Sequence, residues 1–132
     1  MIVVDTSALI AILRGEGDAI KIAEVLGNAD RRLISAGTML EAGLVTVHTG
    51  DELSRLMELV EQTQLEIVAT SEAEVQTGIL AARRYGRGSS HPAKLNFGDC
   101  FAYALAKTRN LPLLFKGDDF IHTDITPALG LA

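Results

Sequence analysis

Short apolar runs alternate along the chain with longer segments in which apolar residues recur every three to four positions. The short runs predict buried strands, at residues 1–4, 32–35, 66–69 and 113–115. The longer segments predict helices, over residues 7–13, 18–27, 38–49 and 97–108, with two more that start at Asp51 and Ser71. Residues 123–125 are expected to add a short edge strand. Because strands that alternate with helices form right-handed βαβ units, we predict an α/β fold, with a mostly parallel sheet of about four to five strands between two layers of helices.

The same periodicity predicts which face of each helix is buried. Between residues 97 and 108, one stripe contains Phe97, Cys100, Phe101, Ala104, Leu105 and Thr108. At roughly 100° per residue, Asp99 lies about 200° around the helix from Phe97 and therefore off this stripe. In the other helices, the residues expected to face inward are Ile20, Ala23, Val25, Leu26, Leu40, Leu44, Val47, Leu53, Leu56, Leu59, Val60, Val75, Ile79, Leu80 and Ala82.

The length of 132 residues fits a single domain that spans residues 1–132. Apolar residues make up 48% of the chain and charged residues 22%, a balance that excludes a disordered chain. The longest charge-free stretches, residues 33–40 and 42–50, are too short to cross a membrane. Because Asp5 lies within the first five residues and no basic residues precede an apolar run, we expect no secretory signal. The single cysteine, Cys100, excludes an internal disulfide, so we expect a protein of the reducing cytoplasm.

Charge is distributed unevenly along the chain. There are 12 Lys and Arg residues against 17 Asp and Glu residues, for a net charge of −5. Residues 83–94, called the basic strip below, contain no acid and four cations, which are Arg83, Arg84, Arg87 and Lys94. An acidic protein with one basic strip is a poor general nucleic-acid binder, so we expect no specific DNA binding by this chain alone. The strip is either a solvated surface loop or a local contact for a polyanion.

Acidic residues follow two of the predicted strands at the point where each strand ends. Asp5 comes directly after the first apolar run, and Asp118 and Asp119 follow the last long strand. Glu41 and Asp99 lie in the first turns of two predicted helices. Because the carboxyl ends of parallel strands meet at one edge of a sheet, we expect these acids to converge there.

Each acid also has a purely structural interpretation. Helix capping accounts for three of them, namely Asp5 alone, Glu41 with Thr38, and Asp99 with Asn96. A turn after Gly117 accounts for Asp118 and Asp119. Capping alone does not require these positions to meet, so their convergence at one edge would indicate a shared function.

Converging acids would determine the chemistry of the site. Like charges a few ångströms apart raise one another's pKa or bind a cation. Oxygen donors without His or Cys select hard ions, so the pattern favours Mg²⁺ or Mn²⁺ over zinc. Such ions prefer phosphate oxygens as their remaining ligands, which favours metal-assisted hydrolysis of a phosphodiester.

Four segments together resemble the PIN-domain superfamily and, within it, the VapC toxin ribonucleases of type II toxin–antitoxin systems. They are residues 2–9 (IVVDTSAL), Glu41, residues 95–106 (LNFGDCFAYALA), and residues 113–120 (LLFKGDDF) with 123–125 (TDI). The resemblance covers essentially the whole chain. It implies a compact α/β/α endoribonuclease that uses Mg²⁺ or Mn²⁺.

The resemblance also implies roles for individual residues. Asp5 and Asp99 match the principal metal ligands of the family. Glu41 matches a third acid, which binds the metal or positions the nucleophilic water. Asp118 is the better match to the fourth acid, with Asp119 in a structural role beside Phe120. Supporting roles, such as orienting Asp5 or contacting a phosphate, are assigned to Thr6, Ser7 and Asn96.

Two protein partners are implied by the same resemblance. One is a second copy of the chain in a homodimer, and the other is a small VapB-type antitoxin that covers the active-site groove. We hypothesise that the basic strip guides the RNA backbone toward the metal. Two alternatives stay open, a catalytically silent PIN-like module that only binds a partner and an α/β phosphoryl-transfer domain.

Overall fold

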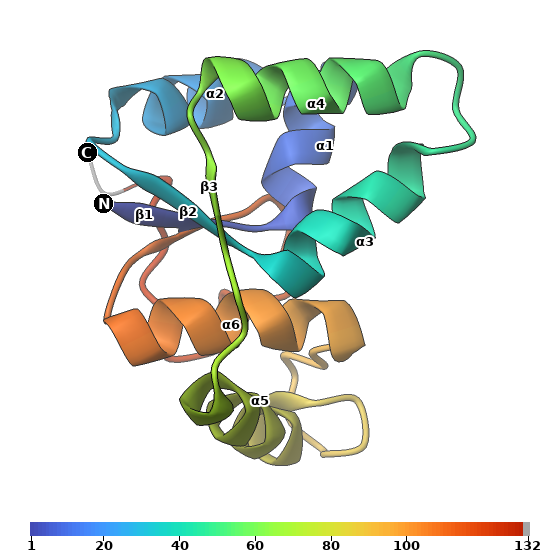
Figure 1. The fold of residues 1–132 in the computed structure, drawn as a ribbon. Coiled ribbons are helices and arrows are strands. Elements are labelled where there is room, and N and C mark those ends of the chain that lie inside the picture. Colours follow the sequence, from blue (N-terminus) through green and yellow to red (C-terminus); the bar gives the residue numbers. More distant parts are fainter. Residues whose placement is uncertain (131–132) are drawn as a thin grey trace.

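Four parallel strands form one sheet in the order β3-β2-β1-β4 in a computed structural model, which describes residues 1–130 (Figure 1). The strands are β1 (Ile2–Val4), β2 (Arg32–Ser35), β3 (Glu66–Val68) and β4 (Leu113–Leu114). The helices are α1 (Thr6–Arg14), α2 (Ala19–Asn28), α3 (Ala36–Thr46), α4 (Glu52–Gln62), α5 (Glu72–Tyr85) and α6 (Phe97–Arg109). The predicted α/β class and parallel sheet are confirmed. Among the described residues, no helix has the length and apolar character that crossing a bilayer requires.

Helices cover both faces of the sheet (Figure 1). Because successive side chains of a strand point to opposite faces, Val3 and Val4 enter two different cores. Val4 packs in the core that Leu9 of α1 and Leu56 of α4 help to build. Val3 packs in the core on the other face, which includes Leu105 of α6. This arrangement confirms three layers, and it puts β1 in the interior of the sheet.

The buried face of α6 differs from the predicted stripe. Phe97 is 76% exposed, whereas Tyr103 is buried. The helix lies between the sheet and α5, so small side chains such as Ala102 and Ala106 contribute to a broad buried arc (Figure 1). Asp99, expected to lie away from the buried face, is itself buried, because the first turn of α6 packs against side chains of other elements.

Most apolar residues expected to face inward from α3 and α5 are exposed instead. The side of α5 that faces α6 carries small residues, Gly78 and Ala81, so its larger apolar side chains lie outside. The prediction was wrong for Leu40 and Leu44 on α3 and Val47 directly after it, for Val75, Ile79, Leu80 and Ala82 on α5, and for Ile20 and Ala23 on α2. The prediction is confirmed for Leu26 and Leu56, which are fully buried in α2 and α4.

The expected edge strand at residues 123–125 is not a strand. The backbone instead pairs with β4 at Thr126, whose carbonyl oxygen accepts a hydrogen bond from Leu113 N (2.9 Å). The Thr123 hydroxyl donates to the carbonyl oxygen of Phe120 (2.7 Å). Local bonds of this kind compete with strand pairing, which explains why the β-prone run does not extend the sheet.

Arg32, at the start of β2, ties together the ends of two helices. Its guanidinium donates to the carbonyl oxygen of Thr63 (2.8 Å), directly after α4. It also donates to the carbonyl oxygens of Gly27 (3.0 Å) and Ala29 (2.8 Å) at the end of α2. Carbonyls at the ends of helices lack intrahelical partners, and one planar guanidinium satisfies several of them here.

We expect Arg32→Lys to lower the free energy of unfolding by about 1–3 kcal/mol, because a lysine leaves several of these carbonyls without a donor. Urea denaturation followed by circular dichroism measures the change. The matched control is Arg31→Lys, since the Arg31–Glu66 pair is exposed and surface ion pairs contribute little. Equal losses in the two variants would contradict the role assigned to Arg32.

Candidate active site

Acidic side chains from five segments line one cleft of about 440 Å³ at the carboxyl edge of the sheet. Asp5 follows β1, Glu16 lies in the loop after α1, Glu41 lies on α3, Asp99 lies in the first turn of α6, and Asp119 lies in the loop after β4. The structure therefore brings together Asp5, Glu41 and Asp99, as expected from the sequence. Because the two strands that precede Asp5 and Asp119 are hydrogen-bonded neighbours, their ends open onto the same cleft.

Asp5 is fixed by its own helix and by β4. One carboxylate oxygen, Oδ2, accepts hydrogen bonds from Ser7 N (3.0 Å) and Ser7 Oγ (2.7 Å), so Asp5 does cap α1. Ser7 Oγ in turn accepts from Lys116 N (2.9 Å), which connects the cap to the loop after β4. The other oxygen, Asp5 Oδ1, is buried and has no hydrogen-bond partner. Burial raises the pKa of Asp5 to about 6, although the bonds from Ser7 oppose the shift.

Asp99 caps its own helix and also lines the cleft. Its Oδ2 accepts from Asn96 N (3.0 Å), while Asn96 Oδ1 accepts from Asp99 N (2.8 Å), which completes the predicted capping box of α6. Burial is the main cause that raises the pKa of Asp99 to about 7, and the charges of Asp5, Asp119 and Glu41 add to it. The capping bonds leave the carboxylate in contact with the cleft.

Glu41 is held by Thr6 and not by a capping box. Thr6 Oγ1 donates to Glu41 Oε1 at 2.6 Å and lies 3.1 Å from the carbonyl oxygen of Thr38. The expected box between Thr38 and Glu41 is absent because α3 begins at Ala36, so Glu41 falls in its second turn. The Glu41 carboxylate is consequently free to reach across to α1 and α6.

The acid that joins Asp5, Glu41 and Asp99 from the loop after β4 is Asp119, whereas the sequence favoured Asp118. Asp119 lines the cleft and its charge contributes to the raised pKa of both Asp5 and Asp99. Asp118 is exposed and does not line the cleft. The difference depends on Gly117, whose φ of +99° turns the chain in a way that residue spacing does not reveal.

Lys116 is a cleft residue that sequence reasoning missed. It lies directly after the last apolar run, and its ammonium nitrogen lies 3.1 Å from Glu16 Oε1. Both residues line the cleft. The signal that could have found Lys116 is its position between a strand end and Gly117, where side chains face the carboxyl edge of the sheet.

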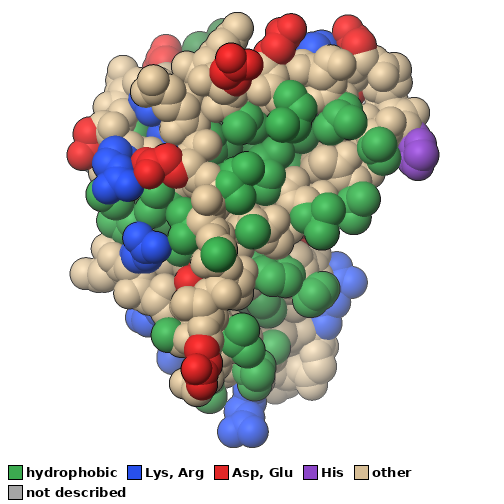
Figure 2. Space-filling view, in the orientation of Figure 1, with side chains coloured by type: hydrophobic (Ala, Val, Ile, Leu, Met, Phe, Trp, Pro, Cys, Tyr) green, Lys and Arg blue, Asp and Glu red, His purple; other side chains and the backbone are tan. Residues whose placement is uncertain are grey.

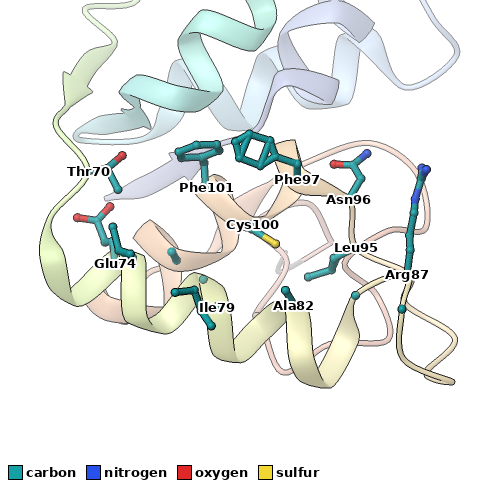
Figure 3. A pocket seen from close by; sticks show the side chains of 15 residues that line it. Thr70, Glu74, Ile79, Ala82, Arg87, Leu95, Asn96, Phe97, Cys100 and Phe101 are labelled. Carbon is teal, nitrogen blue, oxygen red and sulfur yellow. The ribbon is translucent and has the colours of Figure 1, made fainter.

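The basic strip lies elsewhere in the molecule. Arg83 and Arg84 lie in the last turn of α5, and Arg87 and Lys94 lie in the loop before α6, all of them exposed. None of the four lines the acid cleft. Arg87 lines a different, mostly apolar cavity of about 480 Å³ between α5 and α6 (Figure 3).

The acids of the cleft fit a hard divalent cation. Asp5 Oδ1 is an unpartnered buried acceptor, and the pKa values of Asp5 and Asp99 are raised mainly by burial, with a smaller contribution from the neighbouring acids. The acidic donors are all oxygen atoms, which suits Mg²⁺ or Mn²⁺. Within residues 1–130, no three acidic, His or Cys side chains are already close enough to form a complete metal site, so binding requires side-chain adjustment.

The family model of the PIN domain matches residues 2–125. The chain belongs to the PIN-domain family. Within it, Ribonuclease VapC28 of Mycobacterium tuberculosis is 48% identical over 129 residues, which cover 96% of this chain and 97% of the relative. Ribonuclease VapC42 of the same organism is 41% identical over 128 residues, covering 96% of this chain and 98% of the relative. This PIN domain is therefore a member of the VapC ribonuclease group.

Solved structures share the fold of this PIN domain. The crystal structure of Mycobacterium tuberculosis VapC20, a sarcin-ricin loop cleaving toxin, superposes with a TM-score of 0.73 at 15% identity, covering 96% of this chain and 97% of that chain. A toxin–antitoxin complex from Klebsiella pneumoniae gives a TM-score of 0.73 at 19% identity, covering 97% and 98% of the two chains. Both confirm the PIN-like three-layer architecture.

The metal-free PIN domain should lose stability as the pH rises. The pKa of Asp5 is about 6 in the folded protein against its usual 3.8, so the protonated form favours folding. This contribution is complete below pH 3.8, and it is lost as the pH rises through 6. Asp5→Asn keeps the shape without the charge, so we expect it to exceed the wild type in unfolding free energy by about 2–3 kcal/mol above pH 7.

Urea unfolding in EDTA, repeated from pH 4 to pH 8, tests this prediction. Asp118→Asn removes an exposed carboxylate of the same type and should retain the pH dependence of the wild type. Parallel pH profiles for the wild type and Asp5→Asn would contradict it.

Proposed function

We propose that this protein is a metal-dependent endoribonuclease, the toxin of a type II toxin–antitoxin pair, which hydrolyses RNA phosphodiester bonds in the acid cleft. The observation that carries the proposal is the buried, partnerless Oδ1 of Asp5 within a cluster of carboxylates that line one cleft. Relatives at 41–48% identity are named ribonucleases, which supports RNA as the substrate class. The proposed compartment is the cytoplasm, in keeping with a single, half-buried cysteine.

Four of the cleft acids would hold Mg²⁺ or Mn²⁺, namely Asp5, Glu41, Asp99 and Asp119. The remaining one, Glu16, is paired with Lys116. When bound, the ion activates water and stabilises the charge that develops on the phosphate. The chain supplies the orientation of each carboxylate. Ser7 holds Asp5, Asn96 holds Asp99 and Thr6 holds Glu41, so these three polar residues fix the geometry in which the acids meet.

RNA binding at the basic strip is also part of the proposal. The strip ends at Lys94, two residues before the capping residue Asn96 of the helix that carries Asp99. Its cations are exposed and unopposed by acids within residues 83–94, which suits contacts to the phosphate backbone. Such contacts would position RNA without reading its sequence.

Cleavage of a structured RNA in the presence of Mn²⁺ should distinguish the roles of Asp118 and Asp119. We expect Asp119→Asn to slow single-turnover cleavage by about tenfold or more, because it removes a charge from the cleft. Asp118→Asn is the matched control and should stay within about threefold of the wild type. Asp5→Ala should abolish cleavage, measured by gel electrophoresis of end-labelled RNA.

Cleavage that persists in Asp5→Ala would contradict the proposed active site. Equal effects at Asp118 and Asp119 would contradict the choice of the fourth acid. A wild-type protein that cleaves no RNA with either ion would favour the alternative of a silent, partner-binding PIN domain.

We further propose that a second copy of the chain and a small VapB-type antitoxin are its protein partners. Apolar side chains gather on the face that α3, β3, α5 and α6 present (Figure 2). The largest exposed ones on these elements are Leu40, Leu44, Ile67, Val75, Ile79, Leu80 and Phe97. Together with the cavity between α5 and α6, they form a surface whose apolar character is typical of an obligate interface (Figure 3). We assign this face to the second copy.

A charge on this face should break the homodimer. Ile79 is 63% exposed and lines the cavity, so we expect Ile79→Asp to convert a dimer into a folded monomer. Light scattering coupled to gel filtration gives the mass in solution. Ile20→Asp is the control, because Ile20 is 76% exposed but lies on α2, away from the cavity. A wild-type protein that is already a monomer, or a dimer that survives Ile79→Asp, would contradict the assignment.

A further inference from the structure

Helices α3 and α6 approach each other through two glycines. A Cβ atom added at Gly37 of α3 would lie 2.4 Å from the ring of Phe101 on α6. A Cβ atom added at Gly98 of α6 would lie 2.0 Å from Oε2 of Glu41 on α3. On each helix, a glycine therefore lies against a large side chain of the other helix. The contact at Gly37 is apolar and the contact at Gly98 is polar.

The polar contact involves the whole Glu41 carboxylate. The added Cβ at Gly98 would lie 2.7 Å from Glu41 Cδ and 3.0 Å from Oε1, in addition to the shorter approach to Oε2. Oε1 is also the atom that Thr6 binds at 2.6 Å. The carboxylate thus lies between the Thr6 hydroxyl and the backbone of Gly98, one residue before Asp99.

We propose that Gly98 is a positioning residue for Glu41: its missing side chain leaves the space at the start of α6 that the Glu41 carboxylate occupies in the acid cleft. The inference rests on the proposed function, since it concerns the same cleft. It adds a residue that neither binds the cation nor touches the RNA, and that acts through Glu41.

The backbone alone does not require a glycine at this position. Gly98 lies in the first turn of α6 and is not among the residues with positive φ, so an alanine fits its conformation. Alanine is also the better helix former. The atoms that an alanine would displace belong to the far end of a flexible side chain, so the fold can adapt while the carboxylate is pushed away.

Gly98→Ala tests the inference, with Gly43→Ala as the matched control. Gly43 is a glycine of α3 with nothing within 4 Å of an added Cβ. We expect Gly98→Ala to slow RNA cleavage by about tenfold or more and to weaken Mn²⁺ binding, measured by calorimetry, by about fivefold or more. The unfolding temperature of metal-free Gly98→Ala should not fall below that of the wild type. Gly43→Ala should stay within about twofold in cleavage and in Mn²⁺ binding.

A positioning role also requires coupling to Glu41. In a Glu41→Ala background, Gly98→Ala should change the Mn²⁺ dissociation constant by less than about twofold, because the side chain that it displaces is gone. An equal loss of affinity in both backgrounds would overturn the inference. So would wild-type cleavage by Gly98→Ala, unchanged Mn²⁺ affinity in the presence of Glu41, or a fall in the unfolding temperature that accounts for the lost activity.

The controls separate this inference from the proposed function. A wild-type protein that neither binds Mn²⁺ nor cleaves RNA removes the proposed function. A wild-type protein that does both, beside a Gly98→Ala variant that matches it, removes the role of Gly98 alone.

Discussion

Carboxylates of like charge that share a buried cleft are the constraint around which this structure is built. Burial penalises the charged forms of Asp5 and Asp99, and the neighbouring acids add repulsion. Hydrogen bonds from Ser7 and Asn96 offset only part of that cost. Neutral residues at these positions would cost less stability, so the cleft concentrates negative charge at the expense of the free energy of folding.

Sequence reasoning located the cleft because it depends on a rule of topology. Parallel strands end at the same edge of a sheet, so Asp5 and the acids after β4 had to lie near one another. The capping box of Asn96 and Asp99 could also be predicted, since it depends on the residue types and their spacing alone. The choice between Asp118 and Asp119 could not be predicted, because it depends on the turn at Gly117. The pattern of residues does not specify the φ angle of that turn.

The faces of the outer helices were the least predictable part of the fold. Periodicity assumes that large apolar residues are buried, but α5 meets α6 through Gly78 and Ala81 and leaves Ile79 outside. Likewise, Phe97 begins α6 beyond the edge of the sheet, while Tyr103 fills the core and donates to Asp124 Oδ1 (2.7 Å). An apolar stripe shows that one face of a helix is suited to burial. A helix that binds another protein through that face has the same stripe as a helix that packs in a core.

The order of the strands has a consequence for folding during synthesis on the ribosome. β1 emerges first, yet it occupies the interior of the sheet beside β4, which emerges last. Asp5 cannot meet Asp99 and Asp119 until α6 and the loop after β4 have been translated. Chains leave the ribosome amino end first, so an unfinished polypeptide has no assembled cleft. A ribonuclease with this connectivity therefore acquires its assembled acid cleft only when its own synthesis is complete.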